Sequence, residues 1–231
     1  MNRRELLEFT RYTLSDAGYI LSELVEYEPD DTLAEQRRAE SYAKDIRGIA
    51  RAVWQSLPID AYPMMWDVVG LGISTAWQQG AASCGISEDE LTLDERIRRD
   101  IIINEQRNYI IGFIDWVYEH RRDGPDKLPL ASIIARANTW QKGYLEAYNL
   151  AKMMACGNQK LMWMREVLRS VKQGCNDCLN YDGRVYRAST WHRYDIRPQH
   201  PGLGCHGFGA CGFVVTDEKC NPGRPPGMTG K

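Results

Sequence analysis

Two close pairs of cysteines in the last quarter of the chain constrain its fold more than any other feature. Cys175 and Cys178 are separated by two residues, Cys205 and Cys211 by five, and 26 residues lie between the pairs. Two such pairs suit a tetrahedral zinc ion, because each pair can chelate the metal from one tight turn. Glycines beside both pairs, Gly174 among them, allow the backbone to turn sharply. The spacing predicts a zinc site with these four cysteines as ligands.

Other readings of the cysteines stay open from the sequence. His206, His200 and Cys220 lie close enough along the chain to replace one ligand. A C-x2-C pair is also typical of thioredoxin-like redox proteins, but that chemistry requires a βαβ setting that the surrounding sequence does not show. Cys84 and Cys156 lie in helical patterns and are expected to be small buried residues.

The N-terminus carries no apolar stretch of the signal-peptide type. A reducing compartment is therefore expected, and a disulfide framework is not. Residues 68–87 contain no charged side chain, but they include several polar residues and four glycines. This stretch is too polar for a membrane-spanning helix, so it is expected to be a helix buried among other helices.

The first two thirds of the chain repeats the apolar spacing of amphipathic helices. Capping boxes at Thr32 with Glu35 and at Thr92 with Glu95 predict the starts of two of these helices. The helices are expected over about residues 6–28, 33–57, 62–83, 93–123 and 130–156. The tryptophans within them are expected to belong to the core: Trp54, Trp66, Trp77, Trp116 and Trp140.

The pattern changes at Gly157, and 11 of the 20 glycines of the chain lie after residue 156. Residues 161–164 could form a strand or one turn of helix. Asp182-Gly183 lies between two short apolar runs and predicts a β-hairpin, because both residues tolerate positive φ. The last segment, 221–231, holds three prolines and three glycines. We expect this segment to bury nothing and to be a flexible tail.

These observations predict a mainly α fold with three parts. The first is a multi-helix body over residues 1–156. The second is a small zinc-stapled α+β module over 157–220, which contains the hairpin, and the third is the Pro/Gly tail over 221–231.

Charge is divided unevenly between these parts. Residues 160–231 carry 11 Lys and Arg against 6 Asp and Glu, a net charge of +5, while the rest of the chain has a net charge of −7. A basic C-terminal part could contact a polyanion, although a solvated basic face is an equally good reading. The candidate phosphate contacts are Arg184, Arg187, Arg193 and Arg197, with Tyr186, Trp191 and Tyr194 as candidates for stacking on bases. This reading describes a cytoplasmic zinc-module nucleic-acid-binding protein.

Common catalytic motifs are missing from the sequence. It contains no phosphate loop, no G-x-G-x-x-G, no G-x-S-x-G and no zinc-deaminase signature. Asp115 and Glu119 are four residues apart on an expected helix, a spacing more typical of a solvated face than of a catalytic pair. The sequence therefore gives no positive case for an enzyme, and an unrecognised nuclease or transferase is the third alternative.

The segment from Trp163 to Cys211 runs W…C-N-D-C-L-N-Y-D-G-R-V-Y-R-A-S-T-W…R-P-Q-H-P-G-L-G-C…C. It resembles the C-terminal module of tailed-phage minor head proteins, the head-morphogenesis family typified by the F protein of phage Mu. The close resemblance covers about 70 of the 231 residues. The family usually ends in C-x-C, whereas Gly212-Phe213 follows Cys211 here, which leaves the fourth ligand open, with His206 as the next candidate.

The resemblance implies a non-enzymatic virion protein that acts inside the capsid or near the portal vertex. Its partners would be portal or capsid proteins, several copies would assemble together, and packaged DNA would be a further contact. The protein would be present in the host cytoplasm during assembly, with no membrane partner.

Overall fold

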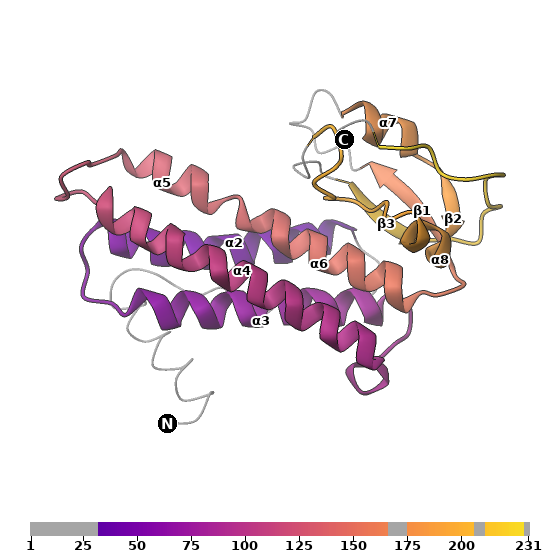
Figure 1. Ribbon diagram of the computed structural model, residues 1–231, viewed down its shortest axis with the longest axis horizontal. Helices are drawn as coiled ribbons and strands as arrows, with labels where there is room; N and C mark the ends of the chain where they lie inside the picture. The colour runs from indigo at the N-terminus through magenta and orange to yellow at the C-terminus, as the bar shows by residue number, and fades with distance from the viewer. Residues whose placement is uncertain (1–31, 166–174, 206–210, 229–231) are drawn as a thin grey trace. The chain divides into compact units, whose positions relative to one another are not determined.

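The computed structural model describes residues 32–165, 175–205 and 211–228 of the chain (Figure 1). The helix expected near residues 6–28 lies outside the described residues. The N-terminal elements are α2 (Thr32–Trp54), α3 (Ala61–Ala82), the short 3₁₀ helix η1 (Glu88–Glu90), α4 (Leu93–Glu119), α5 (Leu130–Ala137) and α6 (Trp140–Ala155). The C-terminal elements are β1 (Lys160–Arg165), α7 (Asn176–Tyr181), β2 (Val185–Arg187), α8 (Ala188–Arg193) and β3 (Cys211–Val215). The predicted fold class, mainly helical with a small sheet near the C-terminus, is confirmed.

The described residues divide into two compact units. The helical unit consists of residues 37–72 and 103–141. The sheet unit consists of residues 32–36, 73–102 and the described part of 142–228. The predicted boundary at residue 156 does not coincide with this division, because most of α6 groups with the sheet. None of the helices in the described part of the chain is long and apolar enough to cross a membrane.

The core of the helical unit is mostly aliphatic, with a few aromatic side chains packed into it. The rings of Phe113 and Trp140 are tilted against each other with centroids 4.7 Å apart. Gly72 allows α3 to approach α2 closely, because a Cβ at this position would lie 2.3 Å from the ring of Tyr42. Trp66 is 39% exposed, so the expectation that every tryptophan of the helices lies in the core is wrong at this position.

The described helices begin and end within a few residues of the expected positions, except over 130–156. The capping box before α4 is confirmed: the Glu95 carboxylate accepts from the backbone N–H of Thr92 at 2.7 Å, and the Thr92 hydroxyl accepts from the N–H of Glu95 at 3.3 Å. The single helix expected over 130–156 is instead two helices, broken at Asn138 and Thr139. The Thr139 hydroxyl donates to the carbonyl of Arg136 at 2.8 Å, a local bond that competes with helix propagation.

The sheet has the strand order β2-β1-β3, and both pairings are antiparallel. Residues 160–162 pair with 185–187, and residues 161–165 pair with 211–215. The strand reading of residues 161–164 is therefore the correct one. Trp163, Tyr181, Trp191 and Phe213 form an aromatic core under the sheet, with ring centroids 4.8–5.9 Å apart. All four side chains are almost completely buried.

The hairpin predicted across Asp182-Gly183 is wrong. The residues before this dipeptide form α7, and β2 pairs with β1, which precedes α7 in the chain. Asp182 is the C-cap of α7, and Gly183 follows it with φ of +72°. A positive-φ glycine just after a helix is a common helix terminator, and it has the same sequence signature as a two-residue hairpin turn.

Cys84 and Cys156 form a disulfide across 72 residues. Both side chains are buried, as expected, but the disulfide between them was not predicted. The bond links the ends of α3 and α6. Gly80 allows these helices to pack closely, because a Cβ at this position would lie only 2.3 Å from the Tyr148 carbonyl oxygen. No local pattern could reveal this pairing, since it depends on how two distant helices pack.

The C-terminal segment also differs from its prediction. Pro225 is buried, and the side chain of Met228 lies beside Gly202. The backbone N–H of Asn221 donates to the Val185 carbonyl at 2.8 Å. The expectation that this segment buries nothing is wrong for residues 221–228.

Candidate metal centre

The first cysteine pair lies at the N-terminus of α7. Cys175 is the N-cap residue in an extended conformation, and its sulfur accepts from the backbone N–H of Cys178 at 3.4 Å. The sulfurs of Cys175 and Cys178 are 3.3 Å apart. The capping geometry therefore places both thiols on one side of the first turn of α7.

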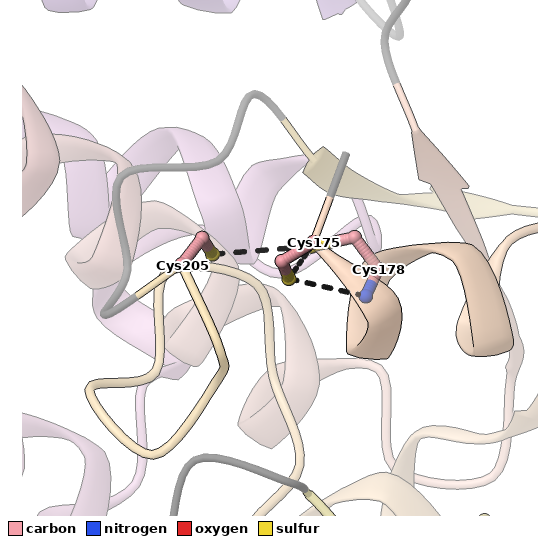
Figure 2. A group of neighbouring side chains, drawn as sticks. All are labelled: Cys175, Cys178 and Cys205. Atoms are coloured by element: carbon pink, nitrogen blue, oxygen red, sulfur yellow. Dashed lines mark hydrogen bonds between the residues drawn. The ribbon is translucent and has the colours of Figure 1, made fainter. Parts of the chain in front are cut away.

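Cys205 brings a third thiol to this pair from the loop that follows α8 (Figure 2). Its sulfur is 4.0 Å from that of Cys178, and the three sulfurs lie within 4.8 Å of one another. Two sulfurs bound to one tetrahedral zinc ion at about 2.3 Å are separated by about 3.8 Å. The observed separations of 3.3 and 4.0 Å lie on either side of this value, so the thiols fit a zinc-sized ion.

Asp177 fixes the loop that carries the third thiol. It is fully buried between the two cysteines of the first pair, and its carboxylate accepts from the backbone N–H of Gly204 at 2.8 Å. This bond ties the residue before Cys205 to α7. The sequence analysis missed Asp177, for which the only available signal was an acidic residue inside a C-x2-C motif.

Cys211, the fourth predicted ligand, lies at the start of β3 and is buried. Its thiol interacts with that of Cys178. The hydrogen bond with Cys205 lowers the pKa of Cys178, but the bond with Cys211, burial and the nearby thiols outweigh it, and the pKa lies well above its usual value. The Cys178 thiol therefore stays protonated unless a cation stabilises its thiolate.

Two buried side-chain amides hold the strand that carries Cys211. Gln199 donates to the Cys211 carbonyl at 2.7 Å, and Asn149 of α6 accepts from the N–H of Phe213 at 3.0 Å. The Asn149 amide also donates to the Gln199 side chain at 2.9 Å. The two amides therefore take the place of a neighbouring strand along the free edge of β3. No sequence signal marks either residue.

The alternative ligands lie elsewhere or outside the described residues. His200 is bonded to the Asp195 carboxylate at 3.1 Å and accepts from the N–H of Gly202 at 2.9 Å. Burial and the positive charge of Arg197 lower the pKa of His200. Neither His200 nor Cys220 belongs to the thiol cluster in the described part of the chain. His206 lies outside the described residues.

The four arginines predicted to contact phosphate differ in their exposure to solvent. Arg187 and Arg193 are exposed, and Arg184 is partly exposed. The Arg197 side chain is only 7% exposed, and it binds the carboxylates of Glu146, at 2.9 Å, and Asp195. This placement contradicts the predicted role of Arg197 in phosphate contact.

The aromatic residues predicted to stack on bases are also divided. Trp191 is fully buried in the aromatic core, and Tyr186 is 3% exposed. Tyr194 alone among the three is exposed, at 42%. The described residues therefore offer a cysteine cluster that could hold a metal ion and a buried aromatic core, and they place only Tyr194 of the three predicted stacking residues at the surface.

No family model matches this chain, and no curated protein or solved structure is significantly similar to it.

Proposed function

We propose that this protein is a structural component of a phage head, with a C-terminal module held together by zinc and with no catalytic activity of its own. The observation that carries the proposal is the cluster of Cys175, Cys178 and Cys205. These cysteines belong to the segment that resembles the minor head proteins, and Trp163 and Trp191 of the same segment form the core of the module. The residues on which the resemblance rests are thus the same residues that form the cysteine cluster and the core of the module.

The donor set favours zinc over other metals. Thiolates are soft ligands that suit zinc, whereas calcium and magnesium require oxygen ligands. The interaction between the thiols of Cys211 and Cys178 supports Cys211 as the fourth ligand. A zinc ion bound by all four cysteines would then have a closed set of four thiolates. A zinc ion with four protein ligands has no open position for substrate, so its role would be structural.

Surface composition supports protein contacts as the means of action. Several large apolar side chains on α4 are exposed, and Leu93, Ile97 and Ile101 recur every four residues at 72, 49 and 40% exposure. Residues at this spacing lie on one helix face. Exposed apolar surface of this kind is typical of protein–protein interaction sites. In the proposed role, the partners are portal or capsid proteins.

Co-expression with phage portal and capsid proteins tests the proposed role. We expect the full chain to co-purify with portal or capsid assemblies, and Cys178→Ser to lose this association together with its zinc. Cys220→Ser is the matched control, because Cys220 lies outside the cluster. Wild-type protein that carries zinc but joins no such assembly would contradict the virion role while leaving the metal site intact.

DNA binding is the measurement that separates the alternative function. Exposed Arg187 and Arg193 would give phosphate contacts whose affinity falls steeply as salt increases. Tight, salt-dependent DNA binding that is lost in Arg187→Gln with Arg193→Gln, without any capsid association, would favour the nucleic-acid-binding protein instead.

A further inference from the structure

The C-terminal segment is anchored at the outer edge of β2, opposite β1. The backbone N–H of Asn221 donates to the Val185 carbonyl at 2.8 Å, and the Val185 N–H donates to the Asn221 side-chain oxygen at 2.7 Å. Asn221 therefore pairs with the free edge of the sheet as a short strand would. This pairing fixes where the following residues begin.

Proline and glycine set the path of the chain after Asn221. Gly223 has φ of +76°, which lets the chain turn directly after Pro222. Arg224 and Pro225 each precede a proline, a position that favours the extended polyproline II conformation. Since prolines lack an N–H group, the carbonyl groups are the main polar groups that this stretch offers.

Two tyrosines satisfy those carbonyls. The Tyr181 hydroxyl donates to the Pro226 carbonyl at 2.8 Å, and the Tyr186 hydroxyl donates to the Arg224 carbonyl at 3.4 Å. Pro225, between the two bonded residues, is buried. Aromatic grooves that bond the carbonyls of an extended proline-rich stretch are a known mode of peptide recognition.

We infer that Tyr181, Tyr186 and the edge of β2 form a docking groove for a proline-rich segment, and that a second copy of this chain can fill it with its own residues 221–228. The segment contacts the groove through non-covalent bonds to residues at least 35 positions earlier in the chain. Its connection to β3 runs through exposed residues 217–219. The same bonds would therefore form with a segment from another copy, which is exchange of an identical element between protomers.

The groove is tested in the full chain by cutting the connection after folding. A protease site inserted between Glu218 and Lys219 is cleaved in the purified protein, which is then dialysed against an excess of a labelled synthetic peptide of residues 221–228. We expect the cut chain to take up the peptide and the uncut chain to take up at least about tenfold less, because its own segment competes at a high effective concentration.

Tyrosine variants show whether the groove is responsible. Loss of one good hydrogen bond weakens binding by up to about tenfold, so Tyr181→Phe should weaken peptide uptake by about this factor, and Tyr186→Phe by less, because its bond is longer. Tyr194→Phe is the matched control, since Tyr194 is exposed, and it should bind the peptide like the parent.

Two results would overturn the inference. One is a cut chain that keeps the near-ultraviolet circular dichroism of its tryptophan core but takes up no peptide, and the other is equal uptake by Tyr181→Phe and the parent. If cutting abolishes that spectrum, uncut chains with two different tags are co-expressed instead. Co-purification of the two tags that weakens in Tyr181→Phe would support exchange, and its absence at high protein concentration would refute it.

Discussion

Replacing Asn149 by alanine tests whether the amide pair holds β3 in place. Asn149 is 1% exposed, and its side chain bonds both Gln199 and the backbone N–H of Phe213. Alanine leaves both partner groups buried without these bonds. Each unsatisfied buried group costs about 1–3 kcal/mol, so Asn149→Ala should lower the free energy of unfolding by about 2–6 kcal/mol.

Urea denaturation followed by tryptophan fluorescence measures this loss, because Trp163 and Trp191 lie in the core beside β3. Asn104→Ala on α4 is the matched control: Asn104 is exposed, and the change should alter the free energy of unfolding by no more than about 0.5 kcal/mol. A loss below about 1 kcal/mol in Asn149→Ala would refute the argument that the amide pair replaces a neighbouring strand.

Three further perturbations follow from single contacts. Replacing Cys84 and Cys156 with alanine opens a loop of 72 residues and should cost up to roughly 4 kcal/mol, visible as a lower melting temperature than that of the oxidised parent. Arg197→Met leaves Glu146 without its partner and should lower the free energy of unfolding in urea by about 2 kcal/mol. The loss is smaller than for a fully buried ion pair because the carboxylates are partly exposed, and an unchanged urea midpoint would contradict this prediction. Gly183→Ala forces a side chain into the left-handed region at φ of +72° and should cost about 1 kcal/mol, whereas an equally stable variant would show that this conformation is not required.

Periodicity and caps predicted the helices well because these signals are local. The Thr92 capping box and the glycine–proline stops depend on residues a few positions apart, and the structure places α3 and α4 within a few residues of the expected ranges. The break at Asn138 and Thr139 was missed, because the polar side chains that end α5 did not interrupt the apolar pattern.

The C-terminal module could be predicted only in part. The cysteine spacing identified the thiols that the fold brings together, since both the spacing and the chelate geometry are local. The pairing of β2 with β1 was not predictable, because Gly183 suits a hairpin turn and a helix terminus equally well. The roles of Asn149 and Gln199 depend on a contact between residues 50 positions apart. The segment after Cys220 was wrongly predicted to be unburied, because that prediction used only its proline and glycine content.

Metal content is the measurement that tests the central claim most directly. Protein purified without chelators should carry about one zinc per chain, and X-ray absorption should show sulfur ligands at about 2.3 Å. Cys175→Ser and Cys178→Ser should each reduce the bound zinc and loosen the module, while Cys220→Ser should keep the full equivalent. Wild-type protein with well under half an equivalent of zinc, or zinc retained in full by Cys178→Ser, would contradict the account.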